Sequence, residues 1–178
     1  MEPAVKPAAE QTQTGVVGVL ATPATFQGKL YASVVERFAN GVHLLQDTCP
    51  GLVAQIEQGE LQGPKTRAIL EDALTPMLES GIDRVVMGCT HYPFVIPLIR
   101  EIVGPGVNVI DPAPAVARQV GRVLADLGLL NNTSQAGIVR YLTSGDGSKL
   151  IILLPTLIGE TGNVKQIHWK QNRVTWQN

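Results

Sequence analysis

A cysteine, a threonine and a histidine follow one another where an apolar segment of the chain ends. Residues 82–87 are mostly apolar and β-branched and lie between two glycines, which predicts a buried strand. Cys89, Thr90 and His91 come directly after its end, and the carboxyl ends of parallel strands are where α/β sheets bind ligands. The thiolate is the reactive form of cysteine, and a nearby imidazole can accept the thiol proton. The triplet therefore predicts a nucleophilic or proton-transferring cysteine, with a small buried apolar residue as the alternative for Cys89.

Alternating apolar segments and amphipathic stretches predict the elements that would position this triplet. Strands are expected at 15–20, 42–45, 82–87 and 107–110, and helices at 26–39, 66–80, 94–102 and 115–127. Strands that alternate with helices of this length predict an α/β fold with a parallel sheet. Thr25 is expected to cap the first helix, and Gly128 to close the last one. Residues 1–14 read as an exposed linker because of their prolines, and 138–142 and 167–176 as two further strands.

Composition excludes several classes of function. The 178 residues carry a formal net charge of −1, which argues against nucleic-acid binding. No apolar stretch approaches the roughly 20 residues needed to cross a bilayer, and no secretory signal follows Met1. Two cysteines and three histidines do not have the spacing of a zinc site, so no metal is expected. These features favour a reduced, cytoplasmic setting.

Other polar residues have simple structural interpretations. Cys49, in a Cys-Pro-Gly turn, is interpreted as structural, and His43, in an apolar run, as a core histidine. Asp111 and Asp146 are expected to stabilise turns. Taken by themselves, Thr22 and Thr25 would be turn and cap residues, and Glu57 a solvated residue on an amphipathic helix. If a helix begins at Thr90, its free backbone N–H can bind a carboxylate.

Five ordered blocks of the sequence resemble the glutamate racemases of the aspartate/glutamate racemase superfamily. The second catalytic motif of that family is similar to 88–93 (Gly-Cys-Thr-His-Tyr-Pro), and its threonine-rich substrate turn is similar to 18–25, followed by Tyr31. The other blocks are 49–53 with Glu57, 110–113 with Ala117, and 143–146. The resemblance covers about residues 2–169. One departure is Gly28, where the family usually has serine.

The resemblance implies interconversion of L- and D-glutamate without pyridoxal phosphate or another cofactor, supplying D-glutamate for peptidoglycan. Two acid/base groups must then flank the α-carbon, one on each face. Cys89 would be one of the two thiols, on the L-glutamate face, and His91 would orient or protonate it. Thr22, Thr25 and Thr90 would bind the substrate, and Glu57 would help to arrange its amino group or Cys89.

The family pattern begins with an Asp-Ser-Gly turn and a Cys-Asn-Thr motif that are absent from this sequence. The expectation is therefore a chain that lacks the part with the first catalytic cysteine and is inactive alone. Residues 1–110 would form the second racemase α/β domain, a nearly complete three-layer domain around a parallel sheet. Residues 111–178 would be a return segment that belongs to a further, incomplete α/β domain and packs on the missing first domain. Apolar residues left exposed there, such as Ile151, Ile152 and Leu153, would favour association or disorder.

Two other functions stay open. The chain could belong to another racemase of the superfamily, acting on aspartate or hydantoins, or it could be a non-catalytic binding module or the subunit of a split enzyme. The partners expected are a small-molecule substrate and either an upstream fragment or a second copy of the chain, with no nucleic acid and no membrane.

Overall fold

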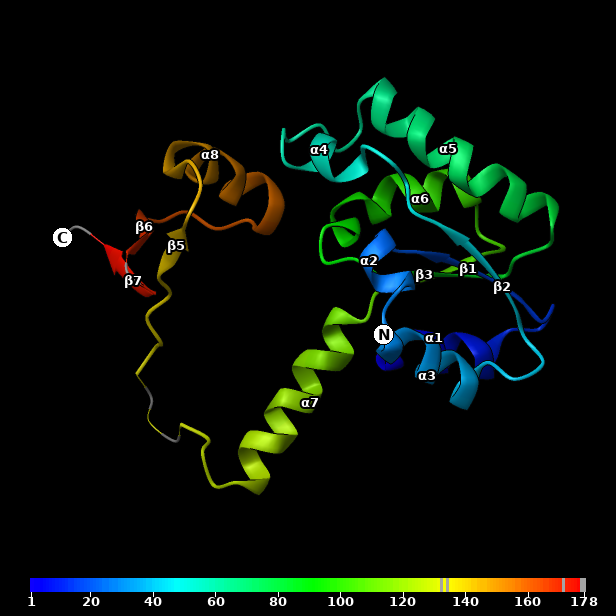
Figure 1. Ribbon diagram of the computed structural model, residues 1–178, viewed down its shortest axis with the longest axis horizontal. Coiled ribbons are helices and arrows are strands. Elements are labelled where there is room, and N and C mark those ends of the chain that lie inside the picture. The colour runs from blue at the N-terminus through cyan, green and yellow to red at the C-terminus, as the bar shows by residue number, and fades with distance from the viewer. Residues whose placement is uncertain (132, 134, 171, 177–178) are drawn as a thin grey trace. The chain divides into compact units, whose positions relative to one another are not determined.

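The computed structural model describes residues 1–131, 133, 135–170 and 172–176, and the chain divides into two compact units (Figure 1). The first unit comprises Met1–Ile56 and Glu60–Leu130, and the second comprises Glu57–Gly59 and Asn131–Asn178. Each unit has its own sheet.

The first unit is built on a four-stranded parallel sheet with the order β2-β1-β3-β4. The strands are β1 (Val16–Leu20), β2 (His43–Asp47), β3 (Arg84–Met87) and β4 (Asn108–Ile110). All four expected strands are present, with β2 two residues longer at its end than the sequence predicted. Val17, Val19 and Leu20 of the central strand β1 are fully buried, as expected where helices cover both faces of a parallel sheet.

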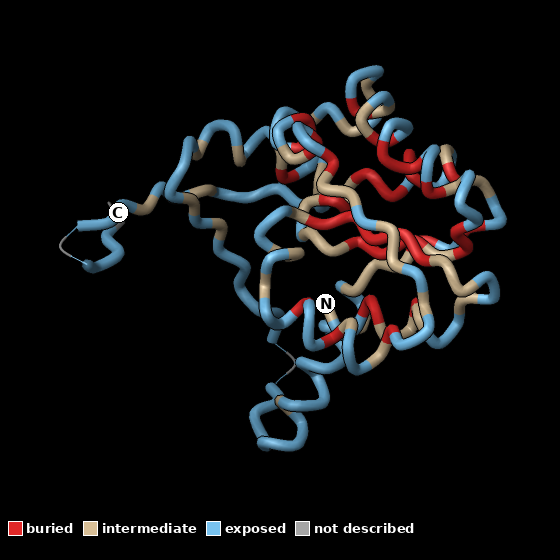
Figure 2. The backbone as a smooth tube through the Cα atoms, turned by 45° about the vertical axis from the view of Figure 1, so that its right-hand side comes forward, coloured by how far each residue is buried: buried red, intermediate tan, exposed pale blue. Residues whose placement is uncertain are grey.

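Helices form a layer on each face of this sheet, which confirms the expected three-layer α/β architecture (Figure 1). The helices of the first unit are α1 (Glu2–Gln11), α2 (Pro23–Phe26), α3 (Lys29–Phe38), α4 (Leu52–Ile56), α5 (Pro64–Glu79), the 3₁₀ helix η1 (Tyr92–Val95), α6 (Ile96–Val103) and α7 (Ala113–Asp126). In Figure 1, α1 and α3 lie on one side of the sheet, and α5 and α6 on the other. Figure 2 shows the buried segments gathered in the sheet and in the flanking helices.

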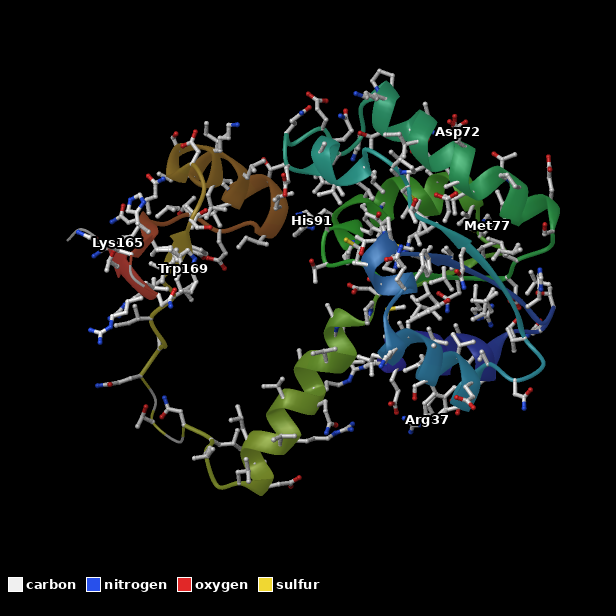
Figure 3. All side chains as sticks on the ribbon, in the orientation of Figure 1. Arg37, Asp72, Met77, His91, Lys165 and Trp169 are labelled. Carbon is white, nitrogen blue, oxygen red and sulfur yellow. The ribbon has the colours of Figure 1, made fainter. Side chains whose placement is uncertain are left out.

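Close helix-to-sheet packing depends on a glycine in β1. A Cβ atom at Gly18 would lie 2.9 Å from the sulfur of Met77 and 3.3 Å from Val85. Met77 is a buried residue of α5 and lies between that helix and the sheet (Figure 3). The missing side chain at Gly18 therefore lets α5 approach the centre of the sheet.

The interpretation of residues 1–14 as an exposed linker was wrong, because residues 2–11 form helix α1. Ala4, Val5 and Ala8 are fully or almost fully buried and belong to the core cluster between α1, α3 and the sheet. Pro3 lies in the first turn of α1, where the backbone N–H groups have no partner within the helix and proline is tolerated. Pro7 lies inside the helix, where proline is disfavoured. The small apolar residues that face the sheet outweigh the turn-forming tendency of the prolines.

The expected helix over 26–39 is divided. The short helix α2 ends at Phe26, and α3 begins at Lys29 with Gly28 as its N-cap. Thr25 is therefore not a cap but part of α2, with its hydroxyl 3.1 Å from that of Thr22. The backbone is extended at Gly28 (φ −75°, ψ 133°), which separates the two helices and makes this residue the N-cap of α3.

The second unit contains a three-stranded sheet and one helix. Its elements are β5 (Tyr141–Thr143), α8 (Gly147–Ile158), β6 (Val164–Lys170) and β7 (Arg173–Trp176), with β5 parallel and β7 antiparallel to β6. The expected single strand over 167–176 is a hairpin, and Asn172 between its strands has a left-handed backbone with φ of 60°. Asp146 caps α8 by accepting a hydrogen bond from the Ser148 N–H, which confirms its expected role.

Helix α7 has no buried residue, and Val116, Val120 and Val123 are each about half exposed. This helix belongs to the first compact unit, which extends to Leu130. The division into racemase domains at residue 110 stays a prediction. Ile151 and Ile152 of α8 are also exposed, as expected, whereas Leu153 is only partly exposed.

Of the helices in the described part of the chain, none is long and apolar enough to cross a bilayer.

A buried carboxylate ties the end of α1 to the start of β3. Asp83 accepts hydrogen bonds of 2.6 Å from both the Thr12 hydroxyl and the Gln13 N–H, and it pairs with Arg84 at 3.4 Å. Burial alone would raise the pKa of Asp83, but these hydrogen bonds and the Arg84 charge outweigh it and lower the pKa below its ordinary range. The ionised Asp83 therefore stabilises the fold.

We expect Asp83→Asn to lower the free energy of unfolding by about 1–3 kcal/mol at pH 7, because charged hydrogen bonds are lost. Since folding lowers this pKa, the stabilisation is complete above the unfolded value of about 4 and is lost as the pH falls through the folded value. Urea denaturation at pH 7 and pH 3 measures the difference, which should shrink at pH 3. Asp72→Asn, at an exposed position of α5, is the control. Equal losses in the two variants at pH 7 would contradict the assignment.

Candidate functional site

The residues of the candidate site lie at the carboxyl edge of the first sheet, where its four strands end. Thr22 follows β1, Thr48 follows β2, Cys89 follows β3 and Asp111 follows β4. Because all four strands are parallel, their ends meet at this edge, where ligands of open α/β sheets bind. The predicted location of Cys89 at the end of a buried parallel strand is therefore confirmed.

Cys89 lies on the wall of a pocket of about 510 Å³. The pocket is lined by Met1, Pro3, Met87, Gly88, Cys89, Thr90, Pro93, Asp111, Pro112, Ala113, Val116 and Ala117. Its wall is mostly apolar, and the thiol of Cys89, the hydroxyl of Thr90 and the carboxylate of Asp111 are its polar side chains. Cys89 is partly exposed and Thr90 is exposed, so a small molecule can reach both.

The position of Cys89 depends on a close approach between β3 and β1 at Gly88. The Gly88 N–H donates to the Leu20 carbonyl at 2.7 Å. A Cβ atom at residue 88 would lie 2.7 Å from the Cβ of Ala21 and 3.1 Å from the Leu20 oxygen. Both of these neighbours are fixed by the backbone, so only glycine fits here.

Thr22 and Thr25 are brought together at the start of α2. Their hydroxyl oxygens are 3.1 Å apart, and both residues are partly exposed. Thr22 also lines a second hollow of about 250 Å³, together with Thr48, Cys49, Pro50, Gly51, Val53, Tyr92 and Pro23. The structure therefore places the threonine turn at the same edge of the sheet as Cys89, on the adjacent strand.

Cys49 is a buried thiol with a structural setting. It is 2% exposed, and its N–H donates to the Asp47 carboxylate at 2.6 Å. Burial first, and then the neighbouring Asp47, raise the pKa of the Cys49 thiol well above its ordinary value. A protonated, inaccessible thiol does not act as a nucleophile, which agrees with the structural interpretation from the sequence.

The other two predicted site residues, His91 and Glu57, are not among the residues that line the Cys89 pocket. His91 is partly buried at the N-terminus of η1, two residues after Cys89. Glu57 is exposed and follows the end of α4 at Ile56; it is grouped with the second unit. Their roles stay predictions.

Of the residues in the pocket wall, sequence reasoning predicted only Cys89 and Thr90 as site residues, and Met1, Pro3 and Asp111 are among those that it missed. Met1 and Pro3 belong to the segment that was interpreted as a linker. Asp111 was expected only to stabilise a turn, and it does so, because its carboxylate accepts a hydrogen bond of 2.9 Å from the Ala113 N–H. Its position after the last residue of β4 was the available signal, since that is the same edge that holds Cys89.

The side chains at this edge are suited to proton transfer at a bound small molecule. A partly exposed thiol can donate and accept a proton, and hydroxyl groups can hold a carboxylate. Within the described residues, no cluster of three or more His, Cys, Asp or Glu side chains has the geometry to hold a metal ion.

Comparison with known proteins finds a matching family and relatives of similar sequence and fold. The family model of the Asp/Glu/hydantoin racemases matches residues 1–120. A glutamate racemase from Roseiflexus sp. is 46% identical over 158 residues, which is 88% of this chain and 58% of the relative. A glutamate racemase from Pseudomonas aeruginosa is 47% identical over 167 residues, which is 94% of this chain and 63% of the relative.

Solved structures agree with this match. The glutamate racemase from Thermus thermophilus, solved in complex with β-chloro-D-alanine, superposes with a TM-score of 0.74 at 28% identity. That alignment covers 93% of this chain and 60% of the Thermus chain. The chain therefore spans about three fifths of the length of the relatives that it matches.

We expect Gly88→Ala to lower the free energy of unfolding by about 1–3 kcal/mol, because the added methyl group overlaps the Ala21 side chain and β3 must shift. Thermal unfolding measures the loss, and the amide resonances of Ala21 and Cys89 in a ¹H–¹⁵N spectrum should move. Gly106→Ala is the matched control, since a Cβ atom there meets nothing within 4 Å. Unchanged stability and an unmoved Cys89 resonance would show that the glycine is not required.

Proposed function

The chain belongs to the Asp/Glu/hydantoin racemase family, and on this premise we propose that it takes part in the cofactor-independent interconversion of L- and D-glutamate. The observation that carries the proposal is Cys89. It is a partly exposed thiol at the carboxyl end of β3, on the wall of a pocket at the edge where the threonine turn also lies. The identity of 46–47% with two glutamate racemases supports glutamate as the substrate.

Racemisation requires a proton to leave one face of the α-carbon and another to arrive on the opposite face. In this proposal Cys89 serves one face, as base in one direction and as acid in the other. The second proton-transfer group would come from the part of the relatives' sequences that this chain does not match. Cys49 cannot replace it, because it is buried and protonated.

Threonine hydroxyl groups would hold the substrate beside the thiol. Thr90 follows Cys89 in the pocket wall, and Thr22 and Thr25 lie at the end of the adjacent strand β1. We assign these three threonines to the carboxylates of the substrate. His91 is assigned to orient or protonate Cys89, and Glu57 to arrange the amino group of the substrate or Cys89.

The exposed apolar face of α7 supports a further part of the proposal. Val116 is about half exposed and lines the Cys89 pocket, and Val120 and Val123 continue along the helix. We propose that residues 111–178 pack against the additional α/β part that the relatives contain. Burial of these valines would then also close the wall of the pocket.

A cytoplasmic setting follows from the chemistry, because a reactive thiol must stay reduced. The D-glutamate formed is proposed to serve peptidoglycan synthesis, as the family resemblance implies.

We expect Cys89→Ser to lower the rate of the reaction strongly. The chain is incubated with L-glutamate in D₂O, alone and together with the part of a relative's sequence that it does not match, and α-deuteration and optical rotation are followed. The chain alone is expected to exchange the α-proton slowly without racemisation, and the mixture to racemise. Loss of the thiol should lower the rate by about 10²–10⁴-fold, the contribution of a general acid or base.

Cys49→Ala is the matched thiol control and should keep the rate within a few-fold of the original, since Cys49 does not reach the substrate. Aspartate and hydantoin are tested in parallel. If aspartate or hydantoin were turned over faster than glutamate, that compound and not glutamate would be the substrate. Undiminished racemisation by Cys89→Ser would overturn the catalytic assignment.

A further inference from the structure

Tyr92 connects the loop after β2 with the turn after β3, although these two strands are not neighbours in the sheet. Its hydroxyl donates to the Thr48 carbonyl at 2.8 Å, and its N–H donates to the Cys89 carbonyl at 3.3 Å. Thr48 follows β2 and Cys89 follows β3, and β1 lies between these two strands. Tyr92 therefore bridges the carboxyl edge of the sheet from the Cys89 turn to the loop after β2.

Four hydrogen bonds form a closed ring at this edge. The Ala21 N–H donates to Asp47 at 3.1 Å, and the Gly88 N–H donates to Leu20 at 2.7 Å. The two bonds of Tyr92 complete the ring through Thr48 and Cys89. Of the four, only the Tyr92 hydroxyl bond involves a side chain, so a substitution can open the ring there without changing the backbone.

The loop that Tyr92 holds has a strained backbone. Cys49 has a φ of 43°, in the left-handed region that a residue with a side chain seldom adopts. Strained conformations of this kind persist only where the surrounding contacts enforce them. The Asp47 carboxylate supplies one such contact through the Cys49 N–H, and the Tyr92 hydroxyl supplies the next one along the chain, at Thr48.

The environment of Tyr92 keeps its hydroxyl a donor. The side chain is 1% exposed, and burial raises its pKa well above the ordinary value, so the phenol stays protonated. Loss of this donor would leave the Thr48 carbonyl oxygen without the Tyr92 hydrogen bond, which is partly buried. The same two residues line the 250 Å³ hollow that also contains Thr22.

We propose that Tyr92 is a positioning residue, whose hydroxyl locks the loop 47–51 against the Cys89 turn and so fixes the spacing between Cys89 and the Thr22 turn. The part that concerns glutamate rests on the proposed function, whereas the locking of the loop does not. Tyr92 acts through these loops and does not itself touch the substrate.

Tyr92→Phe tests the proposal, with Thr66→Val as its matched control. Thr66 is also a fully buried residue whose hydroxyl donates to a backbone carbonyl, that of Glu60, outside the ring. Alkylation of Cys49 by iodoacetamide under native conditions is followed by peptide mass spectrometry. Both variants should lose some thermal stability, but only Tyr92→Phe should speed up Cys49 alkylation, by about ten-fold, as the loss of one partly buried hydrogen bond predicts.

Glutamate turnover, measured in the mixture described above, gives the second readout. Tyr92→Phe should lower kcat/KM by about ten-fold, and Thr66→Val should leave it within about two-fold. If Cys49 stays as protected in Tyr92→Phe as in Thr66→Val, the locking role is overturned. If Cys49 becomes reactive while turnover is unchanged, the positioning role is overturned.

A separate outcome concerns the proposed function. If Tyr92→Phe exposes Cys49 but the unsubstituted protein has no activity on glutamate, the locked loop is upheld and the proposed function fails. Hydrogen exchange of the unsubstituted chain covers the case in which Tyr92→Phe does not fold. The amides of Cys49 and Tyr92 should then exchange at similar protected rates, and rapid exchange of Cys49 alone would overturn the proposal.

Discussion

Strands β1 and β3 approach so closely at their carboxyl ends that no side chain fits at Gly88. The Gly88 N–H reaches the Leu20 carbonyl at 2.7 Å, one residue before the chain turns away at Cys89. The thiol therefore leaves the sheet at a position set by backbone hydrogen bonds and not by a flexible loop. The same contact places the turn after β1, with Thr22 and Thr25, beside it. A proton-transfer site needs such fixed placement, because the reacting atoms must meet at hydrogen-bond distance.

The core of the first unit could be predicted from the sequence, because its strands are short apolar runs bounded by turn residues. The ends of the unit could not. Helix α1 contains Pro3 and Pro7, which are locally typical of a linker, and only burial of Ala4, Val5 and Ala8 against the sheet makes it a helix. Similarly, Thr25 has the chemistry of a helix cap, but the backbone is extended at Gly28, which is the N-cap of α3, so that α3 begins at Lys29.

The candidate site was predictable to the extent that it is local in sequence. Cys89 and Thr90 follow one strand, and their place in the pocket wall follows from that strand's position in the sheet. Asp111 enters the same wall because β4 pairs with β3, a neighbour relation that periodicity alone does not reveal. The bond from Tyr92 to Thr48 spans 44 residues, and a pairing of this kind appears only in three dimensions.

Under the proposed function, the chemistry of the pocket explains why the described residues would not suffice to bind glutamate. Glutamate carries two carboxylates and one ammonium group. None of the residues that line the Cys89 pocket is lysine or arginine, and the wall is mostly apolar, with one carboxylate at Asp111. Desolvation of a dicarboxylate in such surroundings is costly unless donors converge on it, and Thr90, Thr22 and Thr25 supply few. In the proposed reaction, further donors and the second proton-transfer group would therefore meet the substrate from the side opposite Cys89, so that binding and inversion would depend on the same opposing surface.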